Sequence, residues 1–166
     1  MKQPYRMKLS NTLLKYFLCC WCIMASINVS GQSHSFNRYH VSVYRGDRAK
    51  IVLTSNPTAK MYRTMITETY YSSKNMVGWH ESTGLNFAGH YCFAYWGCGS
   101  PCQMSAVVDL KTGLVYDGPS AGYGYQFKRN SRLLVVNPDD PHTGCAGCTT
   151  EYWIWDDHHK KFLQLH

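Results

Sequence analysis

Short segments with the side-chain pattern of β-strands follow one another along most of the chain. In residues 39–45 and 104–109, apolar side chains occupy every second position, which is typical of strands with one buried face. Gly, Pro, Asn and Asp residues separate such segments from each other. The pattern predicts further strands at 50–54, 87–96, 114–116, around Phe127, and at 132–136, 151–155 and 162–165.

One segment has a helical pattern instead. Asn56 and Pro57 are a favourable N-cap and a favourable first residue of a helix. Apolar side chains then recur at helical spacing, which predicts one helix of about 12–14 residues docked on the sheet. This apolar stripe consists of Met61, Tyr62, Met65, Ile66, Thr69 and Tyr70, and we expect its two methionines to pack in the core.

The turn at Asp109–Gly113 indicates how neighbouring strands connect. A short polar stretch ending in Gly113 joins two strand-like segments, and this pattern predicts an antiparallel hairpin. The chain as a whole therefore predicts an α+β fold. We expect mainly antiparallel β meanders, sandwich-like or forming a partial barrel, with one docked helix.

The first 31 residues have a different pattern. Four basic residues and no acidic residue precede an apolar run from Tyr16 to Ile27, and small residues follow up to Gly31. This order predicts a secretory signal peptide at residues 1–31. The apolar run has about 12 residues, whereas a membrane-spanning helix needs roughly 20. A retained anchor and a lipoprotein are the alternatives, although Phe17-Leu18-Cys19 lacks the small residue that lipoprotein processing requires.

Removal of the signal leaves residues 32–166 as a single domain, periplasmic or secreted, without a stable membrane anchor. Four of the 17 Lys and Arg residues and none of the 10 acidic residues precede residue 32. The net charge is therefore +3 for the domain, against +7 for the whole chain. Because nucleic-acid binding relies on a strongly basic surface, we expect no nucleic-acid partner.

Five cysteines remain in this domain: Cys92, Cys98, Cys102, Cys145 and Cys148. Disulfides are the default in an oxidising compartment, and an odd count leaves at least one cysteine over. We expect Cys92, inside a predicted strand, to be a buried thiol. The other four suit two structural disulfides, and the sequence does not choose among their connectivities. A zinc site with four cysteine ligands and a thiol–disulfide exchange site are the alternatives.

Several motifs stand out along the domain. They are Asn86–Tyr91 (NFAGHY), Trp96–Gln103 (WGCGSPCQ), Asp109–Gly113 (DLKTG), Ser131–Val136 and the final Tyr-x-Trp hairpin. Together they resemble a group of small exported bacterial proteins of unassigned function, over roughly residues 55–165. The resemblance implies a signal peptide and a periplasmic or secreted location, and it supplies no catalytic residue. The loop at 72–84 and the Cys145/Cys148 pair look like additions to that pattern.

The candidate catalytic residues are His90 and Cys98. A cysteine nucleophile needs a nearby imidazole that generates the thiolate, and a third group that orients the imidazole. Asp109 or Asn86 would be that third group. A disulfide would remove Cys98 as a nucleophile, so a thiol-dependent envelope enzyme is the alternative hypothesis rather than the main one.

The candidate binding residues are the aromatic side chains Tyr95, Trp96, Tyr123 and Tyr125. Some aromatic residues must fill the core, and those on an exposed face would form a surface for a protein or glycan partner. We therefore expect a disulfide-stabilised binding or interaction module whose partner is another envelope or secreted protein. We expect no cofactor and no bound metal; a zinc-stabilised module is the further alternative.

Overall fold

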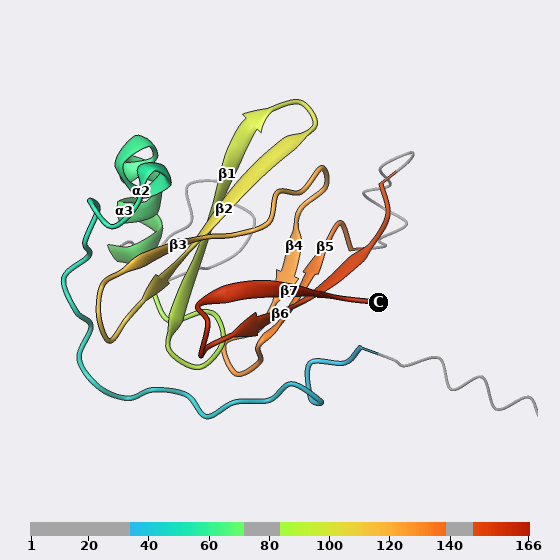
Figure 1. Ribbon diagram of the computed structural model, residues 1–166, viewed down its shortest axis with the longest axis horizontal. Helices are drawn as coiled ribbons and strands as arrows, with labels where there is room; N and C mark the ends of the chain where they lie inside the picture. Colours follow the sequence, from blue (N-terminus) through green and yellow to red (C-terminus); the bar gives the residue numbers. More distant parts are fainter. Residues whose placement is uncertain (1–33, 72–83, 139–147) are drawn as a thin grey trace, which may run out of the picture. The chain divides into compact units, whose positions relative to one another are not determined.

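The computed structural model describes residues 34–71, 84–138 and 148–166. The expected signal segment 1–31 and Cys145 lie outside these residues. In its described residues, the unit His34–His166 contains two antiparallel sheets and two short helices (Figure 1), which confirms the predicted α+β fold made mainly of antiparallel strands. The elements are α2 (Pro57–Met61), α3 (Arg63–Tyr71), β1 (Tyr91–Gly99), β2 (Cys102–Asp109), β3 (Val115–Asp117), β4 (Tyr125–Phe127), β5 (Leu133–Val136), β6 (Glu151–Asp156) and β7 (Lys161–Leu165).

The first sheet has the strand order β1-β2-β3, and both of its connections are antiparallel hairpins. The register of β1 and β2 places Tyr91 opposite Asp109. The predicted turn at Asp109–Gly113 is confirmed, since the Gly113 amide donates to the Asp109 carbonyl at 2.7 Å. Gly113 has a φ of +76°, and a Cβ there would lie 2.0 Å from the Lys50 carbonyl oxygen. Only glycine fits this position without rearrangement.

The second sheet has the order β4-β5-β6-β7, again with antiparallel neighbours throughout. It contains the strands predicted around Phe127 and at 132–136, 151–155 and 162–165, with end points shifted by a few residues. In the described part of the chain, no helix has both the length and the apolar character needed to span a membrane.

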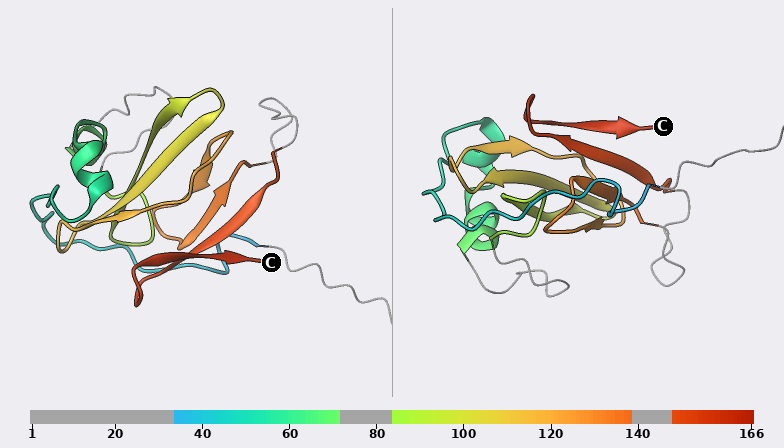
Figure 2. Two further views of the ribbon diagram at one scale, coloured as in Figure 1. Left: turned by 45° about the horizontal axis from the view of Figure 1, so that its top comes forward. Right: turned by 90° about the horizontal axis from the view of Figure 1, so that it is seen from below.

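Strand β1 is buried on both faces, and it therefore joins three layers (Figure 2). Cys92 and Ala94 point to one face and pack with Ile66 and Tyr70 of α3. Tyr91, Phe93 and Tyr95 point to the other face and pack against the second sheet. Because successive side chains of a strand point to opposite faces, a strand covered on both sides is apolar almost throughout, as β1 is.

The helical segment differs from its prediction in two ways. Asn56 caps it as expected, because its Oδ1 accepts from the Ala59 amide at 2.7 Å, but the helix is interrupted at Tyr62. Met61 and Met65 are 72% and 38% exposed, so the prediction that they pack in the core is wrong. The other members of the predicted stripe are covered: Tyr62 is half-buried, and Ile66, Thr69 and Tyr70 are buried.

The strands predicted at 39–45 and 50–54 are not formed. The segment is extended and crosses the ends of several hairpins, with isolated backbone hydrogen bonds instead of a ladder (Figure 1). Two of these bonds join Tyr44 N to Gly89 O and Val52 N to Gly113 O, both at 2.8 Å. The alternation of apolar and polar residues therefore indicates that one face of this segment is covered, although the segment does not pair with a neighbouring strand in a ladder.

Candidate functional site

Five polar side chains from three separate parts of the chain meet at one place, which we call the polar junction: His90, Tyr91, Asp109, Asp157 and Lys160. His90 and Tyr91 stand at the start of β1, and Asp109 ends β2 directly opposite Tyr91. Asp157 and Lys160 belong to the turn between β6 and β7. The Tyr91 ring packs on Trp155 of β6 at 5.0 Å between centroids, and this contact brings the turn to the first sheet.

Two groups donate hydrogen bonds to one oxygen of Asp157, and an imidazole lies beside it. The Tyr91 hydroxyl donates to Asp157 Oδ1, and Lys160 Nζ donates to the same atom at 3.0 Å. His90 Nε2 lies 3.6 Å from it. Lys160 Nζ also donates to the Tyr91 hydroxyl oxygen at 2.7 Å. The Asp157 side chain is 51% exposed, so a solvent-facing carboxylate accepts a hydrogen bond from the buried residue Tyr91.

Asp109 contacts His90 and Lys160 from the buried side of the junction. Its side chain is 3% exposed, with Oδ1 accepting from the Lys111 amide at 2.8 Å. Oδ1 lies 3.8 Å from His90 Nε2, and Oδ2 lies 3.8 Å from Lys160 Nζ. A buried carboxylate is costly unless polar partners surround it, so this contact fixes the Lys160 ammonium in the junction.

The protonation states follow from burial and from these contacts. Burial, assisted by Lys111 and Lys160, lowers the pKa of His90, although Asp109 and Asp157 act in the opposite direction. Partial burial alone would raise the pKa of Asp157, but the hydrogen bonds from Tyr91 and Lys160 outweigh it and hold this pKa below its usual value. At neutral pH the junction therefore contains a neutral imidazole and an ionised Asp157.

The backbone at Lys160 is held in an unfavourable conformation. Its φ is +52°, in the left-handed region that favours glycine, at a cost of about 1 kcal/mol for another residue. Asp156 Oδ1 shapes the turn before it by accepting from the amides of His158 and His159. The contacts of Lys160 Nζ with Tyr91, Asp157 and Asp109 offset this cost and explain why a lysine occupies a glycine-like position.

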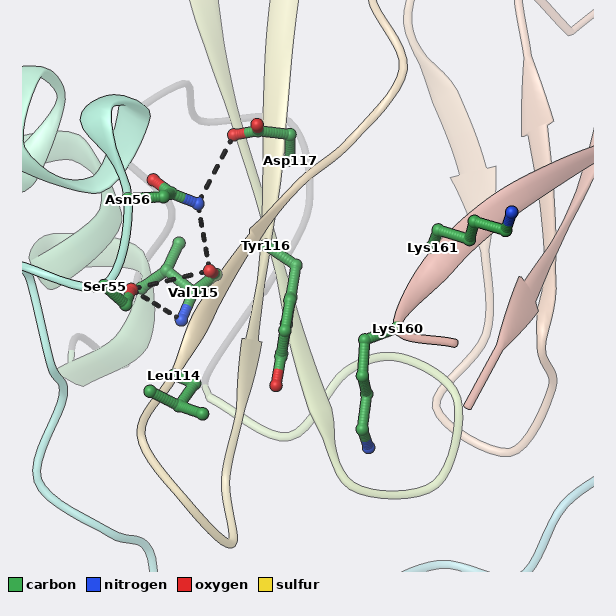
Figure 3. Close-up of a pocket in the computed structure, with 8 residues that line it drawn as sticks. All are labelled: Ser55, Asn56, Leu114, Val115, Tyr116, Asp117, Lys160 and Lys161. Atoms are coloured by element: carbon green, nitrogen blue, oxygen red, sulfur yellow. Dashed lines mark hydrogen bonds between the residues drawn. The ribbon is translucent and has the colours of Figure 1, made fainter. Parts of the chain in front are cut away.

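A pocket of about 420 Å³ adjoins the polar junction through Lys160 (Figure 3). It lies between β3 and the start of β7, which are the edge strands of the two sheets. Ser55 Oγ accepts from the Val115 amide at 3.0 Å, and Asn56 Nδ2 donates to the Val115 carbonyl at 2.9 Å, so these side chains occupy the free edge of β3. The pocket is lined by Ser55, Asn56, Leu114, Val115, Tyr116, Asp117, Lys160 and Lys161.

The predicted catalytic pair is not brought together. His90 directly precedes β1 and Cys98 lies near its far end, which separates them by about 26 Å at 3.3 Å per residue. Cys98 is bonded to Cys102, so it supplies no thiolate for the predicted catalytic pair. Of the two groups suggested to orient His90, Asp109 lies beside it. Asn86 instead bonds the backbone of Phe93, whose amide donates to Asn86 Oδ1 at 2.6 Å.

The cysteines fall into two classes. Cys98 and Cys102 form a disulfide at the tip of the β1–β2 hairpin, with their Cα atoms 5.1 Å apart, and Cys148 is disulfide-bonded as well. Cystine sulfurs are not thiolates, which excludes these residues as ligands of the four-cysteine zinc site considered as an alternative. Cys92 is buried and unpaired, as predicted, and burial raises the pKa of its thiol to about 12.

The predicted aromatic binding surface does not form. Trp96 is buried against Tyr62, with ring centroids 4.8 Å apart. Tyr125 is buried too, and its hydroxyl donates to the Pro119 carbonyl at 2.8 Å. Tyr95 is half-buried beside Tyr125, which leaves Tyr123 as the mainly exposed member of the four. The reason is that both faces of β1 are covered, one by helices and one by the second sheet.

Sequence reasoning missed Tyr91, Asp157 and Lys160 as members of a site. Tyr91 was visible inside the NFAGHY motif, and Asp157 and Lys160 in the polar turn of the final hairpin. Nothing in the sequence indicates that these motifs meet, because the contact depends on how the two sheets pack. Comparison of the chain with protein-family models, curated proteins and solved structures finds no match to any of them.

Proposed function

We propose that the protein is an exported, disulfide-stabilised binding domain whose partner is another envelope or secreted protein. Its binding site is the pocket between β3 and the start of β7, together with the polar junction beside it. The observation that carries the proposal is that Lys160 belongs to both, so that a fixed charge network forms one wall of an open pocket.

The pocket has the features of a recognition site. Its volume of about 420 Å³ falls within the roughly 300–1,000 Å³ of ligand-binding clefts. Leu114 offers an apolar contact, and Lys161 and Asp117 offer charges of both signs. Because Lys160 is already held by Asp109 and Tyr91, its immobilisation costs little further entropy on binding.

Export is supported by the sequence of the first 31 residues and by the cystines. A basic start, a short apolar run and small residues are the order of a secretory signal. Disulfides at Cys98, Cys102 and Cys148 suit an oxidising compartment. An intact-mass measurement on the exported protein tests this part, since we expect a mature chain that begins near Gln32.

Two leucines provide a matched test of the pocket. Leu114 lines the pocket and is 37% exposed, whereas Leu163 lies on β7 outside the lining and is 40% exposed. Immobilised wild-type protein, Leu114→Glu and Leu163→Glu are each incubated with the same envelope extract. We expect a discrete protein to be retained by the wild type and by Leu163→Glu, and to be lost from Leu114→Glu. Equal retention by all three variants, or no retained protein at all, would contradict the proposal.

A further inference from the structure

The donors around Asp157 are held in place without Asp157. Tyr91 is buried, and its ring contacts Trp155 and the His90 imidazole, with centroids 5.0 Å and 4.2 Å away. Lys160 is held by Asp109 and by the Tyr91 hydroxyl. A hydroxyl and an ammonium thus converge on one point as a preformed receptor for a single carboxylate oxygen, with the His90 imidazole 3.6 Å from that oxygen.

The carboxylate that fills this receptor is the least anchored member of the junction. Asp157 is half exposed and lies in a turn, whereas Asp109 and Tyr91 are buried within the first sheet. If the Asp157 side chain turned away from the junction, solvent would hydrate its carboxylate. The adjoining pocket gives an incoming group a route to Lys160. Exchange of one carboxylate for another conserves both the charge and the hydrogen bonds of the junction.

We propose that the polar junction is a carboxylate-binding site that Asp157 fills in the unliganded protein. A carboxylate of the bound partner, from its C-terminus or from an acidic side chain, replaces Asp157 on Tyr91 and Lys160. The inference rests on the proposed function, because the partner enters through the pocket. Asp157 then acts as an intramolecular competitor, which weakens carboxylate binding to the resting protein and makes the site selective for ligands that also gain contacts in the pocket.

Removal of the competitor exposes the site to a small probe. In Asp157→Ala, added acetate fills the vacated position, and we measure the melting temperature in sodium acetate and in sodium chloride of equal ionic strength at neutral pH. We expect an acetate-specific, saturating rise in melting temperature that moves Asp157→Ala toward the wild type. The wild type responds at least about tenfold more weakly, because its own carboxylate competes at high effective concentration.

The control is the double variant Asp157→Ala/Lys160→Met, which lacks the ammonium and is expected to show no acetate-specific rise. Equal responses to acetate and chloride, or equal responses of the single and double variants, would overturn the inference. If Asp157→Ala does not fold, Asp157→Gly is used with the same outcomes, because it also vacates the carboxylate position and leaves Asp156 to shape the turn. These results leave the proposed function open to its own test, since acetate needs no contact with Leu114.

Two short peptides identify the source of the natural carboxylate. Acetyl-Gly-Gly with a free C-terminus presents a main-chain carboxylate, and acetyl-Gly-Asp-Gly-amide presents a side-chain carboxylate. Chemical-shift changes at His90 and Tyr91 of Asp157→Ala with either peptide support the inference, and the stronger binder gives the source. Absence of shifts with both peptides and with acetate would overturn it.

Discussion

Two substitutions of Lys160 separate the contribution of its charge contacts from the cost of its backbone conformation. Lys160→Met removes the ammonium but retains a long side chain on a left-handed backbone. Lys160→Gly removes the same ammonium and also relieves the backbone, because glycine adopts positive φ readily. Comparison of the two variants therefore measures the charge contacts and the conformational cost independently.

The expected loss of stability in Lys160→Met follows from the contacts of the Lys160 ammonium. Its loss removes a 3.0 Å pairing with Asp157 and a 2.7 Å hydrogen bond to Tyr91, and leaves the buried Asp109 carboxylate without the ammonium beside it. Breaking a fully buried pair costs about 3–5 kcal/mol. Lys160 is 33% exposed, so solvent screening reduces this, and we expect Lys160→Met to lose about 2–3 kcal/mol. Lys160→Gly should lose about 1 kcal/mol less than Lys160→Met.

Urea unfolding of the oxidised exported protein at pH 7 measures both values by linear extrapolation. Equal slopes for the wild type and both variants are needed for the comparison, since the slope reports the surface exposed on unfolding. A loss below about 0.5 kcal/mol in Lys160→Met would show that the junction is an ordinary surface ion pair. A glycine variant no more stable than the methionine variant would refute the claim of backbone strain.

Three further predictions concern other parts of the fold. Folding lowers the pKa of His90, so the unfolded chain binds more protons than the folded protein, and stability should fall as the pH decreases below about 6.5. His90→Gln should flatten this pH dependence, which urea unfolding at a series of pH values measures. Joint replacement of Cys98 and Cys102 by alanine opens a five-residue loop and should cost about 2 kcal/mol relative to the oxidised wild type, measured by urea unfolding under oxidising conditions. Gly113→Ala should lose about 2–4 kcal/mol of stability, because the added Cβ clashes with the backbone and φ is positive. Gly97→Ala should change stability by less than about 0.5 kcal/mol, because an added Cβ meets no atom within 4 Å, and similar melting temperatures for the two variants would contradict this.

The features that the sequence predicts correctly are local. Asn56 caps its helix and Gly113 closes its hairpin because each depends on a few neighbouring residues. The strands from β1 to β7 were identified for the same reason, since short alternating or continuously apolar runs bounded by turn residues need no knowledge of the rest of the chain. Burial of Cys92 followed from its place within such a strand.

The features that it misses depend on which surfaces meet. Met61 was assigned to the core because Met61 and Tyr62 are both apolar, and only packing against Trp96 shows which of them is covered. Trp96 and Tyr125 were assigned to a surface because the sequence does not reveal that both faces of β1 are covered.

The polar junction is the strongest example of this limit. Tyr91 and Lys160 are 69 positions apart in the chain, yet the ammonium donates to the hydroxyl at 2.7 Å. Each residue alone is an ordinary member of a strand entry or a turn. The unusual backbone of Lys160 marks the site once coordinates are known, but a positive φ at lysine leaves no signature in composition or periodicity.

Site-specific photo-crosslinking in living cells tests the central claim, that the pocket beside the junction binds a partner, most directly. A photoreactive residue replaces Lys161, which lines the pocket, or Gln164, which is exposed on the same strand outside the lining. We expect a discrete crosslinked adduct from position 161 and none, or a much weaker one, from position 164. Equal adducts from both positions, or no adduct from position 161, would contradict it.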